Sequence, residues 1–314
     1  MMRRVVPRLV GKMNKRFFRF LVIIGAATML IYLLFHRYSA PAHAQRPIVL
    51  VEYRGLYITH DGRNAAYLGS PRDKRGQAVL RPEFVEWQGN LVYWSDTDKS
   101  IAIVHKDGSV RWIEVGKHLP PQVEQVAIAA RGDEIWLNLY SRTFIRHYVG
   151  VLKVLPNSGQ VFPLPGVLEV RASPGGDYLA LLNEDARVKI LLPSGVRNRD
   201  ANFDIIDWDY DARSDCLLVL TEHGVQICRA DSTQFARLPM FYLYRRVYAR
   251  PLTREYWVLC HKPFHFGTVV LAYDYSGRFR RKVLEAGYEC VGIIEPSPQM
   301  LQTIAKLQGA WRSP

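Results

Sequence analysis

The sequence has 314 residues, 48% of them hydrophobic, and a formal net charge of +13. This length fits one large all-β domain or two ordinary domains, with enough apolar residues for a substantial core. Residues 1–44 contain eight basic residues and no acidic residue, which leaves 34 basic against 29 acidic residues in the remainder. Because the excess charge lies mainly at the N-terminus, no nucleic-acid partner is expected.

Residues 20–35, FLVIIGAATMLIYLLF, carry no charge and follow seven basic residues. At about 1.5 Å per residue the run extends roughly 24 Å as a helix, and Phe17 and Phe18 lengthen it towards the roughly 30 Å hydrocarbon layer. By the positive-inside rule, residues 1–19 are a cytoplasmic basic segment and residues 20–35 a transmembrane signal-anchor. Residues 36–47 then form a polar tether.

Two alternatives remain for this N-terminal region. The small residues Ala42 and Ala44 offer a signal-peptide cleavage site before Gln45, and a buried core helix with a basic leader is the third interpretation. With an anchor or a cleaved peptide the remainder of the chain is exported. The sequence has no Asn-x-Ser/Thr sequon, which favours a bacterial periplasm, with the anchor in the inner membrane, over a eukaryotic lumen.

Beyond residue 47 the sequence shows short apolar strands separated by turn residues, with almost no helical periodicity. One hairpin pattern, strand–turn–strand, recurs at intervals of 36 to 51 residues. A tight hairpin favours glycine because glycine adopts positive φ, so the Ser232 turn, which lacks glycine, should be longer. The six turns are Asp61-Gly62, Asp107-Gly108, Ser158-Gly159, Ser194-Gly195, Ser232-Thr233 and Ser276-Gly277.

A second hairpin pattern alternates with the first. Its instances begin at Phe84, Val126, Val170, Ile205, Val247 and Ile293. Together the two patterns give repeats of about 40 residues and four strands, which is a propeller blade. The body begins with a hairpin at 48–68 and ends with one at 288–305, so each terminus should supply half of a shared blade and remove the free edges. We therefore predict an all-β, six-bladed β-propeller over residues 48–308, following the transmembrane helix, with a tail at 309–314; a pair of β-sandwiches is the alternative.

Two turns resemble the SPDG-x-x-LA turn of propeller repeats: Ser173 to Ala180, SPGGDYLA, and Ser297 to Leu301, SPQML. The chain therefore resembles the broad superfamily of WD-repeat, YVTN-repeat and TolB-like propellers over roughly residues 48–308. The Gly-His and Trp-Asp signatures of true WD repeats are absent. The resemblance implies a fold and a habit of binding partners, and it implies no catalytic residue.

Four cysteines have two interpretations. Cys216 and Cys228 flank one expected hairpin with the same parity, and Cys260 and Cys290 lie in successive repeats. In an oxidising compartment one or two disulfides are possible, while four buried thiols in strands are the alternative.

Candidate chemistry is sparse. Alignment of the blades places Glu169, Asp207 and Arg246 at equivalent positions on innermost strands, where enzymes of this fold hold a metal or a catalytic acid, but a local ion pair explains the set as well. The alternating Asp207, Asp209 and Asp211 do not complete a calcium loop, and Cys260, His261 and His265 match no zinc spacing. No metal, cofactor or catalytic residue is therefore assigned.

The stretch Met240 to Trp257 combines six aromatic residues with four arginines. Tyrosine, tryptophan and arginine dominate interface hot spots, so we predict a partner-binding face rather than a catalytic one. Its residues are Tyr242, Tyr244, Arg245, Arg246, Tyr248 and Arg250. The function that follows is a tethered platform for an envelope protein or complex, and the alternatives are a lactonase-like, metal-dependent hydrolase or a glycan-binding module.

Overall fold

The computed structural model describes residues 47–312 apart from 54, 63, 142–146, 174–175, 202–204, 241, 251 and 263–266. All described residues belong to one compact unit, residues 41–314. The predicted basic segment, anchor and most of the tether lie outside the described residues. Within the described part of the chain, no helix combines the length and apolar character needed to cross a membrane.

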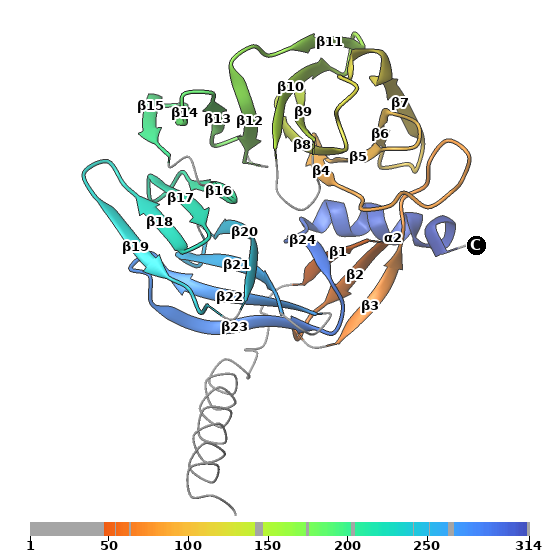
Figure 1. Ribbon diagram of the computed structural model, residues 1–314. Coiled ribbons are helices and arrows are strands. Elements are labelled where there is room, and N and C mark those ends of the chain that lie inside the picture. Colours follow the sequence, from red (N-terminus) through yellow and green to blue (C-terminus); the bar gives the residue numbers. More distant parts are fainter. Residues whose placement is uncertain are drawn as a thin grey trace, which may run out of the picture. The chain divides into compact units, whose positions relative to one another are not determined.

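The unit consists of six four-stranded antiparallel sheets arranged as the blades of a propeller, as predicted (Figure 1). One end strand of each sheet contributes to the lining of a central cavity and is the innermost strand of its blade. From the innermost strand outwards, the blades are β24 (Cys290–Ile294), β1 (Ile48–Glu52), β2 (Gly55–Thr59) and β3 (Ala65–Gly69); β4 (Phe84–Trp87), β5 (Asn90–Ser95), β6 (Ser100–Val104) and β7 (Val110–Glu114); β8 (Gln125–Arg131), β9 (Glu134–Tyr140), β10 (Tyr148–Leu155) and β11 (Gln160–Pro163); β12 (Val167–Ala172), β13 (Leu179–Asn183), β14 (Arg187–Leu192) and β15 (Gly195–Asp200); β16 (Asp207–Asp211), β17 (Cys216–Thr221), β18 (Gly224–Cys228) and β19 (Thr233–Arg237); β20 (Leu243–Arg250), β21 (Glu255–His261), β22 (Thr268–Asp274) and β23 (Phe279–Ala286).

All six predicted turns of the first pattern join the third and fourth strands of a blade. Gly62, in the turn between β2 and β3, has φ of 71°, and a Cβ there would lie 2.3 Å from the Val283 carbonyl oxygen. Only glycine fits both the positive φ and this close approach. The turn without glycine spans residues 229–232, so Thr233 is already the first residue of β19.

The ring closes between the two ends of the described chain. Strand β24 pairs antiparallel with β1, with Ile294 opposite Val49 and Ile293 opposite Leu50. The prediction of a blade shared by both termini is confirmed, but the division between them differs. The N-terminal side supplies three strands and the C-terminal side supplies one. The prediction of a hairpin at 288–305 is therefore wrong beyond β24.

The segment after β24 is a helix, α2 (Pro298–Arg312), which the sequence pattern did not predict. Ser297 caps it, since its Oγ accepts a hydrogen bond from the Met300 N–H at 3.0 Å, and Pro298 occupies the first helical position. Met300, Ile304 and Trp311 recur on one face and are each at most 4% exposed. The helix packs on β3 and β5 and extends past residue 308. A single 3₁₀ turn, Gly116–His118, follows β7.

Apolar side chains fill the space between adjacent blades. Between the blades that start with β12 and β16, fully buried Ile190 packs in one cluster with Trp208 and Val219. Burial of each such side chain contributes about 1.5–3 kcal/mol. Asn138 of β9 joins two blades, because its amide nitrogen donates to the Val170 carbonyl at 2.9 Å and its amide oxygen accepts from the Val170 N–H at 2.7 Å. The innermost strands are therefore held in fixed positions around the central cavity.

Candidate functional site

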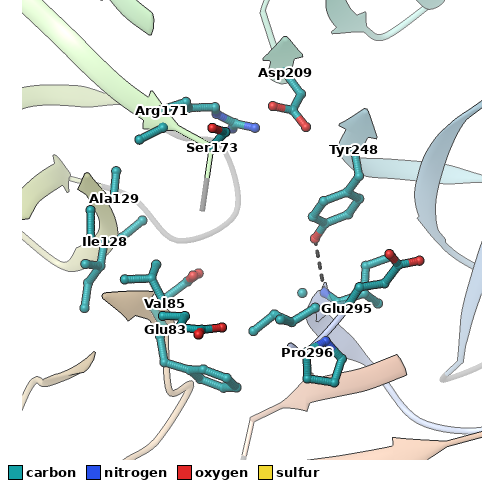
Figure 2. Close-up of a pocket in the computed structure, with 18 of the residues that line it drawn as sticks. Glu83, Val85, Ile128, Ala129, Arg171, Ser173, Asp209, Tyr248, Glu295 and Pro296 are labelled. Carbon is teal, nitrogen blue, oxygen red and sulfur yellow. Dashed lines mark hydrogen bonds between the residues drawn. The ribbon is translucent and has the colours of Figure 1, made fainter. Parts of the chain in front are cut away.

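The six innermost strands enclose a cavity of about 990 Å³ on the propeller axis. Figure 2 shows side chains from several blades pointing into the same space. On one side the lining is apolar, with Val85 from β4 and Ala127 to Ala130 from β8. On the other side the strands β12, β16 and β20 present charged and hydroxyl groups. The cavity is thus amphipathic, which suits a ligand that has an apolar part and a polar part.

Arg171 forms two ion pairs in the polar wall. Its Nη2 lies 3.0 Å from Glu169 Oε1 and also binds Asp207 Oδ1, so it joins β12 to β16. Both carboxylates are buried, with side chains 3% and 1% exposed, while the arginine side chain is 18% exposed.

Neutral donors complete the coordination of these two acids. Trp208 Nε1 donates to Glu169 Oε2 at 2.8 Å, and the Val247 N–H of β20 donates to Asp207 Oδ2 at 2.8 Å. Burial acts to lower the pKa of Arg171, but the charges of Asp207 and Glu169 outweigh it and the pKa is raised. The guanidinium is therefore permanently charged and fixed in position.

Two further ion pairs connect distant parts of the sequence. Arg246 of β20 binds Glu83, 163 residues away, just before β4, and Arg250 binds Glu295, just after β24. Burial acts to lower the pKa of Arg246, and the Glu83 carboxylate reverses the shift, so that the pKa is raised. All three arginines of the cavity lining are thus already paired with carboxylates.

Asp209 of β16 faces the cavity (Figure 2), and no ion pair engages it among the described residues. Its carboxylate accepts hydrogen bonds from the Tyr178 hydroxyl at 3.2 Å and from the Tyr210 and Ala249 N–H groups at 2.9 and 2.8 Å. Burial raises the pKa of Asp209 above its ordinary value, against the lowering effect of Arg171. This acid is therefore held by neutral hydrogen-bond donors, and burial disfavours its charged form.

The structure places the predicted aromatic and arginine stretch mainly on β20, an innermost strand. Arg246, Tyr248 and Arg250 line the cavity, and the Tyr248 hydroxyl accepts a hydrogen bond from the Ile293 N–H at 3.2 Å. Tyr242 is buried just before the strand, while Tyr244 and Arg245 are half-buried. Half of the predicted set therefore meets in one cavity, and a role in binding a partner stays a prediction.

The weaker metal candidates have a structural explanation. Asp207, Asp209 and Asp211 alternate along β16 as expected, and their carboxylates bind arginine, tyrosine and backbone groups. His261 is buried, with Nε2 3.0 Å from the Cys290 carbonyl oxygen, and burial lowers its pKa. His265 lies outside the described residues. Across the described part of the chain, no three His, Cys, Asp or Glu residues are grouped to hold a metal ion.

All four cysteines are buried and free in the structure. The expectation that Cys216 and Cys228 share a face of their hairpin is wrong, because Cys228 pairs with Leu217 in the β17–β18 ladder. Adjacent residues on a strand point to opposite faces, so Cys216 and Cys228 lie on opposite faces of the sheet. Cys260 and Cys290 lie in neighbouring blades, on β21 and β24.

Glu169, Asp207 and Arg246 lie on innermost strands, as the alignment of the blades predicted. Their partners Arg171 and Glu83, and Glu295 beside Arg250, were not predicted. Arg171 could have been predicted from the sequence, since it lies two residues after Glu169 and therefore on the same face of the strand. Glu83 and Glu295 lie beside strand ends, and their partners are defined only when the ring closes.

No model of a known protein family matches the sequence, and no curated protein is significantly similar to it. Among solved structures, a chain of a nidogen/laminin complex is 11% identical with a TM-score of 0.53, over 79% of this chain and 97% of that chain. Apo AztD from Citrobacter koseri is 13% identical with a TM-score of 0.44, over 79% and 96% of the two chains. A putative 6-phosphogluconolactonase from Bacteroides uniformis is 12% identical with a TM-score of 0.44, over 80% and 99%. At 11% identity, the likeness to the first of these structures concerns the fold alone.

Proposed function

We propose that this chain is a membrane-tethered binding protein of a bacterial cell envelope, and that its propeller holds an extended segment of another envelope protein in the central cavity. The observation that carries the proposal is the cavity itself. Its volume of about 990 Å³ is at the upper end of the range of about 300–1,000 Å³ typical of ligand sites. Its polar wall is fixed by three arginines that form four ion pairs with carboxylates, so binding would cost little reorganisation.

The strand edges favour a peptide as the occupant. Each innermost strand pairs with one neighbour, β4 with β5 and β8 with β9, so its other edge has no strand partner among the described strands. An unpaired edge can hydrogen-bond an extended peptide, as in β-strand addition. On β12 and β20 this edge is already used, because Asn138, Asp207 and Asp209 bond the backbone of Val170, Val247 and Ala249. The free edges of β4 and β8 coincide with the apolar wall.

The tether completes the proposal. Residues 20–35 would fix the propeller close to the membrane, and the alternative is release after cleavage near Ala44. Mass spectrometry of the protein isolated from cells distinguishes the two: an anchored chain retains residues 20–35, whereas a cleaved chain begins at Gln45.

The binding site is tested by filling the cavity. Val85 lines the cavity and is half-buried, while Val196, on the outermost strand β15, is 57% exposed. Val85→Trp and Val196→Trp add the same side chain at the two places. Native membranes carrying each variant are lightly crosslinked and solubilised, and the purified protein is analysed by mass spectrometry.

We expect one stoichiometric envelope partner with the unsubstituted chain and with Val196→Trp, and loss of that partner with Val85→Trp. Unchanged melting temperatures show that each variant is folded. Equal recovery of the partner with both tryptophan variants would show that binding occurs elsewhere on the propeller.

A further inference from the structure

The cavity lining and the rest of the protein differ in the sign of their charge. Residues 45–314 contain 34 basic and 29 acidic residues, an excess of positive charge. The lining contains three arginines, Arg171, Arg246 and Arg250, against five acids, which are Glu83, Glu86, Glu169, Asp209 and Glu295. A basic protein thus encloses an acidic cavity, and an acidic cavity with low-dielectric walls attracts cations.

Glu86 is the acid best placed to bind a ligand. It lies on β4 opposite Leu91 of β5, on the face of the strand that it shares with Phe84, and it contributes to the lining of the cavity. It is half-buried, and within the described residues no hydrogen bond or ion pair engages it. Glu83, Glu169 and Glu295 are each already bound to an arginine, and Asp209 is bound to three neutral donors.

We propose that the group bound in the cavity is an ammonium on an apolar stem, with its charge at Glu86 and its stem against the apolar side chains that line the cavity. This inference rests on the proposed use of the cavity as a binding site and names the chemistry that it selects. The same chemistry occurs in a lysine side chain of a partner protein and in a free alkylamine. Asp209, three blades away around the ring, is a second acid of the lining that is not bound to an arginine among the described residues, and it adds to the attraction for a cation.

The test uses probes that share a stem and differ in charge. Calorimetric titration of the full-length protein with hexylammonium, hexanol and hexanoate measures the preference for charge. Parallel titrations use the capped tripeptides Leu-Lys-Leu, Leu-norleucine-Leu and Leu-Glu-Leu. We expect each cation to bind at least about tenfold more tightly than its neutral counterpart, or about 1.4 kcal/mol, and each anion to bind most weakly. Binding of the lysine tripeptide at least tenfold tighter than hexylammonium assigns the site to a protein segment, and the reverse order assigns it to a free amine.

Three substitutions locate the charge. Glu86→Gln should remove the tenfold preference for the cation, and Glu86→Lys should invert it in favour of the anion. Asp209→Asn should weaken cation binding by about twofold to threefold, and the exposed Glu222→Gln, outside the cavity, should change nothing. Melting temperatures within a few degrees of the unsubstituted protein show that the variants are folded.

The outcomes separate this inference from the proposed function. If the cavity-filling Val85→Trp abolishes partner capture but cations and anions bind equally, the binding site stands and the ammonium assignment is overturned. If Val85→Trp changes neither partner capture nor probe binding, the cavity is not a binding site and both are overturned.

Discussion

Replacement of Arg171 by glutamine should destabilise the propeller more than any other single loss of charge in the cavity wall. The guanidinium is the cation that neutralises Glu169 and Asp207, whose side chains are 3% and 1% exposed. Removing one partner of a buried ion pair leaves an uncompensated charge and costs about 3–5 kcal/mol. Because the two acids keep their bonds from Trp208 and Val247, we expect the lower end, about 3 kcal/mol. For a domain of this size that corresponds to a fall of about 6–12 °C in melting temperature.

The assay is thermal unfolding of the purified full-length protein followed by circular dichroism. Asp96→Asn is the matched control, because it removes an exposed ion pair. The side chain of Asp96 is 60% exposed and that of its partner Lys99 is 46% exposed. That loss should cost less than about 0.5 kcal/mol. The double variant Arg171→Gln/Asp207→Asn should cost less than the sum of its single variants, since one of the uncompensated acids is gone. An Arg171→Gln variant as stable as Asp96→Asn would refute the account of a rigid polar wall.

Three more predictions concern stability and the thiols. Burial raises the pKa of Cys216 and Cys290 to about 12, so iodoacetamide at pH 8 should leave all four buried thiols unmodified in the native protein. After denaturation without reductant, mass spectrometry should show four added groups. Fewer than four would indicate a disulfide. Ile304→Ala should lower the free energy of unfolding, measured in urea, by about 2–4 kcal/mol, because the Ile304 side chain is buried. The control Gln302→Ala, at an exposed position of the same helix, should lower it by less than about 0.5 kcal/mol. Equal losses would show that α2 does not pack on the blades. Because burial lowers the pKa of His261, stability should fall as the pH drops below about 6.5, where only the unfolded chain binds the proton, and His261→Gln should flatten that slope.

The architecture was predictable because propeller hairpins are specified locally. Turns such as Asp61-Gly62 and Ser276-Gly277 need residues that adopt positive φ, and they recur at the spacing of a blade. The helix α2 was also encoded, by the capping Ser297, by Pro298 and by the apolar spacing of Met300, Ile304 and Trp311. The similarity of SPQML to a propeller turn concealed it, since Ser-Pro opens both a turn and a helix.

The site was predictable only in part. Alignment of the blades identified strands whose residues line the cavity, and so placed Glu169, Asp207 and Arg246 correctly. The pairings needed three-dimensional information, because Glu83 and Arg246 meet only when β24 closes the ring beside β1. The composition of Met240 to Trp257 indicated an interface, but composition alone does not tell an outer face from an innermost strand.

Photo-crosslinking from inside the cavity in intact cells shows directly whether a partner occupies it. Benzoylphenylalanine is placed at Val85, in the cavity wall, or at Val196, on an exposed outermost strand. We expect a discrete adduct with one envelope protein from position 85, and none from position 196. Adducts from position 196 with none from position 85 would contradict this expectation and would move the binding surface to the outside of the propeller.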